Sequence, residues 1–246
     1  MIRFLLCFLL VAGLLHGQLP VTDLDVPFFD RSSGRLLRRL KAASAIASPE
    51  TALLKSGTVE FFGSETSPGK IGTLTFDNAA YRASADVIES EGPMQLRFVN
   101  GTLSAVGFRY EFLNGRLILK SAVVLDSAEA HAVGREGEAL ISQNKADKDM
   151  LVSVATIRGD VVITEIKVDN VAVERVETAS ASYTGEDGLL RPATPVIFWS
   201  KGERVEMSGK NLSWPISRRA SPLAAPAAQE SPATPAEKSP APTPRR

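Results

Sequence analysis

The chain has 246 residues, and its 28 Lys and Arg balance its 28 Asp and Glu, so the formal net charge at pH 7 is zero. That balance creates no overall field that would attract nucleic acid, and we expect no nucleic-acid partner. The only cysteine is Cys7 and the only histidines are His16 and His131, a poor supply for a zinc site or a Ser-His-Asp triad. We therefore expect a protein that is not an enzyme and that needs no metal or cofactor.

The N-terminal segment, residues 1–17, predicts export. Arg3 is followed by an apolar run from Phe4 to Leu15, which is shorter than the ~20 residues that cross a bilayer as a helix. Removal before Gln18 would make the segment a signal peptide, and an uncleaved membrane anchor is the alternative. Either outcome takes the chain out of the cytoplasm.

The next segment contains a predicted turn at 30–34, followed by a basic stretch. Leu36, Arg38 and Leu40 would share one face of a strand, whereas Leu36, Leu37 and Leu40 would equally form the stripe of a short helix. We expect the basic side chains to form a solvated face, and attraction to an anionic lipid or partner is the alternative. These side chains are Arg35, Arg38, Arg39 and Lys41. Residues 51–63 then predict a strand, since Val59 and Phe61 alternate with Glu60.

The stretch from Lys70 to Leu125 predicts an antiparallel β-meander. Apolar residues recur there at every second position, which is the period of a strand and not of a helix. The dipeptides Gly92-Pro93, Asn100-Gly101 and Asn114-Gly115 separate these runs, and Asn-Gly favours the tight turns of β-hairpins.

The remainder divides into a connector, a second β unit and a tail. Residues 126–150 are polar and predict a connector with one weak strand around 139–142. Strand patterns resume at 151 and continue to 217, where Ala181-Ser182-Tyr183 and the run from Pro195 repeat the pattern of Ala79-Ala80-Tyr81 and the run from Pro93. We interpret 18–125 and 151–217 as two tandem β units whose stacking buries a shared core. Residues 218–246 are rich in Pro and Ala and predict a disordered tail.

The order of residues in the meander resembles a known family. The residues that carry this resemblance are Asp77-Asn78-Ala79-Ala80-Tyr81, Gly92, Leu96, Asn100-Gly101-Thr102-Leu103, Tyr110 and Gly115-Arg116-Leu117. They are similar to the periplasmic lipopolysaccharide-transport (Lpt) proteins of the LptC and LptA type, which have an OstA-like domain. Val26-Pro27-Phe28-Phe29-Asp30 and Gly34-Arg35-Leu36 look like the opening of the LptC kind. The short N-terminal segment departs from LptC, and the second unit and the tail lean toward LptA.

The resemblance implies an all-β fold, an open β-jellyroll (β-taco) of stacked antiparallel strands whose interior holds the acyl chains of lipid A. It implies a periplasmic location. It also implies strand-edge pairing with other Lpt β-jellyroll proteins, and contact with the inner-membrane ABC transporter. The lipid-binding face would consist of Leu74, Phe76, Leu96, Phe98, Phe108, Tyr110, Leu117 and Leu119.

Alternation alone favours a different role for these eight residues. Alternating aromatic and aliphatic side chains usually fill the core of a closed sandwich. A second hypothesis is therefore a structural or adhesive envelope protein with a closed β-sandwich and no lipid ligand.

Overall fold

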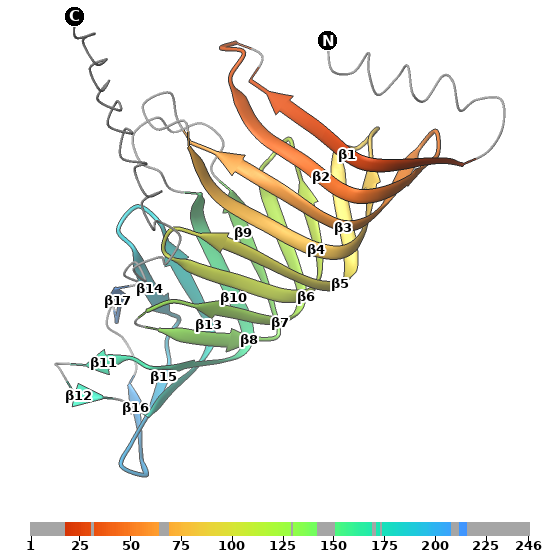
Figure 1. Ribbon diagram of the computed structural model, residues 1–246. Helices are drawn as coiled ribbons and strands as arrows, with labels where there is room; N and C mark the ends of the chain where they lie inside the picture. Colours follow the sequence, from red (N-terminus) through yellow and green to blue (C-terminus); the bar gives the residue numbers. More distant parts are fainter. Residues whose placement is uncertain are drawn as a thin grey trace, which may run out of the picture.

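The computed structural model describes residues 18–30, 32–63, 69–128, 130–141, 151–168, 171–172, 174–207 and 212–215. Within these ranges every regular element is a β-strand, so the predicted all-β fold is confirmed (Figure 1). The strands are β1 (Leu19–Phe29), β2 (Leu36–Ala47), β3 (Thr51–Phe62), β4 (Lys70–Arg82), β5 (Val87–Phe98), β6 (Gly101–Glu111), β7 (Arg116–Asp126), β8 (His131–Gly134), β9 (Glu136–Ile141), β10 (Val152–Thr164), β11 (Lys167–Val168), β12 (Val171–Ala172), β13 (Arg175–Thr184), β14 (Leu189–Pro192), β15 (Val196–Ser200), β16 (Glu203–Met207) and β17 (Trp214–Pro215).

One antiparallel sheet of 15 strands contains all of these except the small pair β11–β12. From β1 to β7 each strand pairs with the next one in the chain, as a meander requires. β8 and β9 both lie between β7 and β10, and β14 and β15 both pair with β13. The sheet therefore runs without a break through both predicted units. The basic stretch, for which a helix was the alternative, is strand β2.

A line of irregular residues crosses the long strands near their midpoints, and we call it the fold line. Asp23, Ser56, Ala122 and Asp160 have positive φ in the middle of their strands although none is a glycine. The pairings β4–β5, β5–β6, β6–β7 and β10–β13 shift register at the same level of the sheet. Such bulges and left-handed residues bend a strand sharply.

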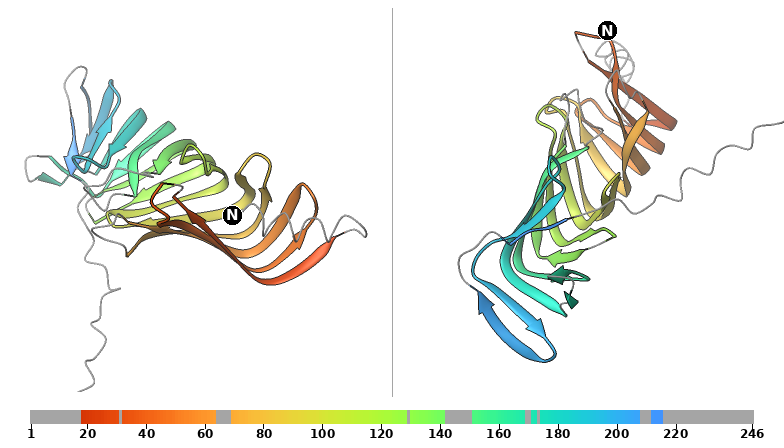
Figure 2. Two further views of the ribbon diagram at one scale, coloured as in Figure 1. Left: turned by 90° about the horizontal axis from the view of Figure 1, so that it is seen from above. Right: turned by 90° about the vertical axis from the view of Figure 1, so that its left-hand side faces the viewer.

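The bend at the fold line divides the sheet into two facing layers (Figures 1 and 2). Layer A contains the strand halves 24–29, 36–42, 57–62, 70–76, 93–98, 101–105, 123–126, 131–134, 161–164, 175–178 and 196–200. Layer B contains the halves 19–22, 44–47, 51–55, 79–82, 87–90, 108–111, 116–119, 136–141, 152–158, 180–184 and 189–192. The ends of the strand halves away from the fold line form the side that we call the mouth.

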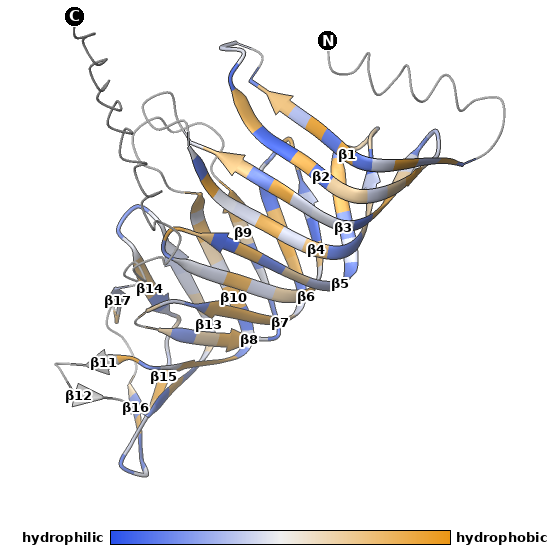
Figure 3. Ribbon diagram, viewed as in Figure 1, coloured by the Kyte–Doolittle hydropathy of each residue, from blue (hydrophilic) through white to orange (hydrophobic). Residues whose placement is uncertain are grey.

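The phase of alternation changes at the fold line in several strands. In β4 the buried residues are Leu74 and Phe76 before the line and Ala79 and Tyr81 after it. β2, β3, β6 and β13 show the same change of phase. The change keeps apolar side chains on the concave side of both layers, and Figure 3 shows the resulting alternation of hydrophobic and hydrophilic residues along the strands.

The turns that were predicted from dipeptides have different outcomes. Phe98 pairs with Gly101, so a tight hairpin does form beside Asn100-Gly101, but its two turn residues are Val99 and Asn100 and Gly101 already begins β6. Gly115 ends the turn between β6 and β7 with a φ of 62°. Gly92-Pro93 is not a turn between strands. It lies inside β5 at the fold line, where the pairing with β6 shifts between Ser90 and Pro93.

The predicted connector 126–150 has more strand structure in its first half than the one weak strand expected around 139–142, which overlaps β9. Residues 131–141 form β8 and β9, which complete the sheet between β7 and β10. All of their inward residues except Ile141 are small, with Ala132, Gly134, Gly137 and Ala139 buried, so the sequence gives only a weak apolar signal there. Residues 142–150, the N-terminal segment 1–17 and the tail 218–246 lie outside the described residues.

The repeat between the two units is visible in the strand pairing. Tyr81 pairs with Ile88 in the first unit, and Tyr183 pairs with Leu190 in the second. The hairpin pair Phe98–Gly101 has its counterpart in Ser200–Glu203 at the same sequence offset. β14 and β15 together take the place of β5, with Pro195 falling where Pro93 lies at the fold line.

Strands β3 and β4 approach each other closely at Gly57, next to the fold line. A Cβ atom on Gly57 would lie 2.2 Å from Cζ of the buried Phe76 ring, so Gly57→Ala would force that ring out of place. We expect a loss of about 1–3 kcal/mol in the free energy of unfolding, which is typical of overpacking, measured by urea denaturation. Gly69→Ala is the control, because nothing lies within 4 Å of its Cβ position. Equal stability of the two variants would contradict this packing.

Candidate functional site: the interior and its mouth

The eight residues predicted as a lipid-binding face all lie on strands of the two layers, and they contribute to the core between these layers. Leu74, Phe76, Leu96 and Phe98 are in layer A, and the other four are in layer B. Seven of them are buried and belong to one continuous hydrophobic core, while Phe98 is half-buried and packs against that core. The structure therefore brings the predicted residues together, in an interior whose two faces are in contact.

Aromatic rings from opposite layers meet across the interior. Near the fold line, the ring centroids of Phe76 and Phe108 are 5.7 Å apart. Closer to the mouth, Phe61 meets the edge of Tyr110 at 5.8 Å. Such ring pairs stabilise by more than the area that they bury, so they join the layers along their depth.

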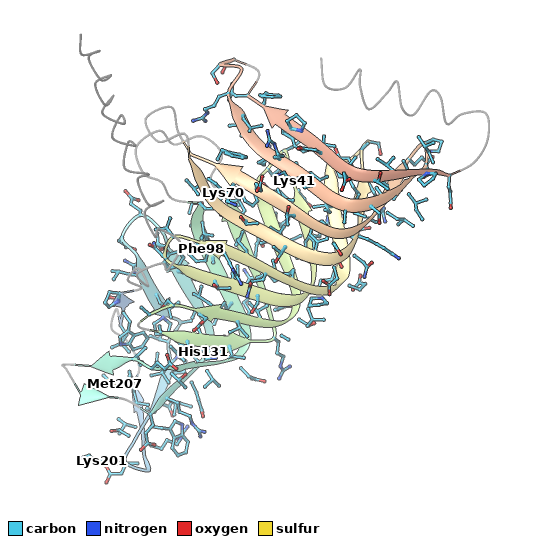
Figure 4. The ribbon with its side chains drawn as sticks, viewed as in Figure 1. Lys41, Lys70, Phe98, His131, Lys201 and Met207 are labelled. Atoms are coloured by element: carbon cyan, nitrogen blue, oxygen red, sulfur yellow. The ribbon has the colours of Figure 1, made fainter. Side chains whose placement is uncertain are left out.

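The mouth is closed by a small number of contacts. Phe98 of layer A lies 6.1 Å from Tyr183 of layer B, and Asn100 donates a hydrogen bond from Nδ2 to the Tyr183 hydroxyl at 2.7 Å. Figure 4 labels Phe98 at the end of β5, beside the start of β4. At the β1 end, Phe28 stacks on Phe112 at 4.9 Å. Separating the layers here would break ring contacts and hydrogen bonds but no backbone pairing of the sheet.

Arg38 lies inside the mouth at the β1 end, with only 9% of its surface exposed. Its Nη1 donates hydrogen bonds to the Tyr110 hydroxyl at 3.1 Å and to the Phe112 carbonyl at 2.5 Å, so it joins layer A to layer B. Its Cζ lies 5.2 Å from the ring centroid of Phe112 and 5.9 Å from that of Phe28. Burial raises the pKa of the Tyr110 hydroxyl, although the nearby Arg38 charge works in the opposite direction.

The burial of Arg38 corrects the expectation that the whole basic stretch is a solvated face. Arg39 and Lys41 do point to the outer side, where they approach Asp25 and Glu60 at 3.5 and 3.1 Å. Arg38 instead lies on the same face of β2 as the buried Leu40 and Ala42. That alternation was the available sequence signal, because Leu36, Arg38 and Leu40 share a face in a strand.

Other candidate sites have little support among the described residues. His131 is half-buried, and its Nδ1 lies 3.4 Å from Oδ1 of Asp126. Among the described residues it forms no hydrogen bond with a serine, threonine or cysteine side chain that would complete a triad. No group of three potential metal ligands occurs in the described ranges. Those ranges also contain no helix with the length and apolar character needed to cross a membrane.

The two ends of the sheet differ in character. β1 pairs only with β2, and its strand contains Pro20 and Pro27. β16 pairs only with β15, and all five of its residues are exposed, including Val205 and Met207. The β15–β16 hairpin extends from the far end of the sheet, where Figure 4 labels Lys201 and Met207. In the part of the chain that the structure describes, β1 and β16 therefore each present an unpaired strand edge, as does the two-residue strand β17, which pairs only with β14.

No protein-family model matches the sequence, and a search of curated proteins found no match.

Proposed function

We propose that the protein is a periplasmic lipopolysaccharide-binding component of the export pathway to the outer membrane. It holds the acyl chains of lipid A between layers A and B and passes the lipid to a neighbouring β-jellyroll protein. The resemblance to the Lpt proteins supplies the identity of the ligand. The observation that carries the proposal is the folded sheet, whose apolar interior ends at a mouth with the half-buried Phe98.

The energetics favour acyl chains as the ligand of such an interior. Apolar surface contributes about 25 cal/mol per Å² when it leaves water, so several acyl chains bind tightly without a catalytic group. Parting the layers exposes their inner faces, and the bound chains cover them again. The fold line acts as the hinge, since away from it the two layers are joined by side-chain contacts, both in the interior and at the mouth.

The edge that receives the partner is β16 in this proposal. A free edge strand adds a partner strand through backbone hydrogen bonds. Proline lacks an N–H, and Pro20 and Pro27 make β1 a poor template. β16 has no proline in Glu203–Met207. An inner-membrane ABC transporter and other Lpt β-jellyroll proteins are the expected neighbours.

The second candidate is a closed structural or adhesive envelope protein without a lipid ligand. The observation that favours it is the near-complete burial of Leu74, Leu96, Phe108, Leu117 and Leu119. In that case the interior is an ordinary core, and no lipid parts the layers.

Phe98→Glu separates the two candidates. A carboxylate at the mouth opposes the entry of acyl chains, because burying it without a partner is costly. We expect lipopolysaccharide binding to fall at least about tenfold, while the circular dichroism spectrum stays that of a β protein. Native mass spectrometry of the purified protein with added lipopolysaccharide measures the saturable adduct.

Leu53→Glu is the matched control, since Leu53 lies on the outer side of β3 and is 52% exposed. It should bind lipopolysaccharide like the wild type. Undiminished binding by a folded Phe98→Glu variant would refute the inward site. Unfolding of that variant would instead favour the closed sandwich.

A further inference from the structure

One side of the Arg38 guanidinium has no hydrogen-bond partner among the described residues. Nη1 donates both of the hydrogen bonds that Arg38 forms with described residues, one to the Tyr110 hydroxyl and one to the Phe112 carbonyl. Nε is buried without a hydrogen-bond partner, and no hydrogen bond or ion pair from Nη2 occurs among the described residues. Nε and Nη2 together form the fork with which arginine binds a carboxylate or phosphate through two parallel hydrogen bonds.

A purely structural role does not account for a charge at this position. Joining the layers requires only a neutral donor to the Phe112 carbonyl and the Tyr110 hydroxyl. Burying a guanidinium without a counter-ion costs far more than burying a neutral amide, unless an anion pairs with it. The Asp86 carboxylate acts electrostatically on Tyr110 and accepts a hydrogen bond from the Tyr81 hydroxyl, and among the described residues Arg38 forms no ion pair with it.

The surroundings of the fork suit a charged group that carries an apolar tail. Phe28 and Phe112 stack on each other beside the guanidinium, and Tyr110 packs against both Phe112 and Phe61. These aromatic rings continue into the core between the layers. An anion at the fork would therefore have its tail next to apolar surface.

We propose that Arg38 binds the oxyanion headgroup, phosphate or carboxylate, of an acylated ligand whose chain enters the interior at the β1 end of the mouth. This inference rests on the proposed function for the acyl-chain site, and it adds Arg38 as the residue that binds the negatively charged headgroup. The Nε–Nη2 fork holds two oxygens of the headgroup, and the Phe28–Phe112 pair borders the first part of the chain.

Three ligands with a common alkyl chain or a common charge test the proposal. Dodecyl phosphate, dodecanol and inorganic phosphate are titrated into the full-length protein by calorimetry, below the concentrations at which the alkyl ligands aggregate. For the wild type we expect dodecyl phosphate to bind at least about tenfold more tightly than dodecanol, as a charge-assisted pair of hydrogen bonds provides. Inorganic phosphate should bind weakly, because it lacks the chain.

Arg38→Gln should reduce the preference for phosphate over alcohol to within about threefold. The preference is a ratio of two affinities, so any effect of the lost contacts between the layers that is common to both ligands cancels in it. Arg97→Gln is the matched control, since Arg97 is exposed and its Nε donates to the Gln95 side chain; the preference should persist. If Arg38→Gln does not fold, Arg38→Lys tests the same point. It keeps the charge but loses the fork, and the preference should fall at least about threefold.

The outcomes separate this inference from the proposed function. If Arg38→Gln keeps the full preference, or if it weakens dodecanol and dodecyl phosphate equally, Arg38 is only a link between the layers. If inorganic phosphate binds as tightly as dodecyl phosphate, the site takes a free anion and the lipid assignment is wrong. If wild-type protein binds neither alkyl ligand, the acyl-chain site itself fails.

Discussion

Phe108→Ala is expected to lower the free energy of unfolding by about 3–5 kcal/mol, which is the usual cost of removing a fully buried phenylalanine ring. Phe108 has no exposed surface, lies next to the fold line on β6 and meets Phe76 of layer A at 5.7 Å. Because bent strands constrain this region, it has little freedom to collapse around the cavity. Urea denaturation followed by circular dichroism measures the change.

Val106→Ala is the matched control on the same strand. Val106 is 45% exposed, so its truncation should change the free energy of unfolding by no more than about 0.5 kcal/mol. The slope of the denaturation curve should be the same for both variants, since the surface exposed on unfolding is nearly unchanged. A cost below about 1 kcal/mol for Phe108→Ala would contradict the close contact of the two layers.

The strands and hairpins were predictable because their signals are local. The period of two between Lys70 and Leu125 and the dipeptide Asn100-Gly101 each act over a few residues. The repeat was also visible in the sequence, since Tyr81 and Tyr183 occupy equivalent places and their pairing partners Ile88 and Leu190 keep the same offset.

The fold line was predictable only in part from residue types. Gly107 and Gly159 adopt positive φ in the middle of β6 and β10, as glycine readily does. The other positive-φ residues on the line are not glycines, and they are Asp23, Ser56, Ala122 and Asp160. Gly92-Pro93, the strongest dipeptide signal at this level, was interpreted as a turn between strands. Each bend depends on neighbouring strands that bend at the same place, so the sequence of a single strand does not predict it.

The candidate site was predicted only in part. The eight residues of the inward face were found because alternation identifies them, but their packing against the opposite layer depends on the fold line. Arg38 was assigned to a solvated face because its neighbours Arg39 and Lys41 are basic and do point outward. The alternation of side chains along a strand puts Arg38 on the same face as Leu40, and it predicts the burial of Arg38 better than the charge of its neighbours does.

The second large effect is expected from fixing the mouth in its closed state. Asn100 and Tyr183 form a hydrogen bond between the layers at 2.7 Å, so cysteines at these two positions lie within reach of a short bifunctional thiosulfonate reagent. In a Cys7→Ser background, this link should abolish lipopolysaccharide binding, because a ligand that binds only the open state gains nothing from a protein held closed. Dithiothreitol should restore binding.

A link inside one layer is the control. Glu111 and Arg116 face each other across the β6–β7 hairpin of layer B, so joining cysteines at these positions leaves the mouth free. That variant should bind lipopolysaccharide equally well before and after linking. The reagent and the cysteines themselves are then excluded as the cause of any loss.

Native mass spectrometry of the Asn100→Cys/Tyr183→Cys protein with lipopolysaccharide, before linking, after linking and after reduction, tests the interior site most directly. The proposed carrier predicts a saturable adduct that disappears on linking and returns on reduction. An adduct that survives linking would place the lipid outside the two layers and contradict the account.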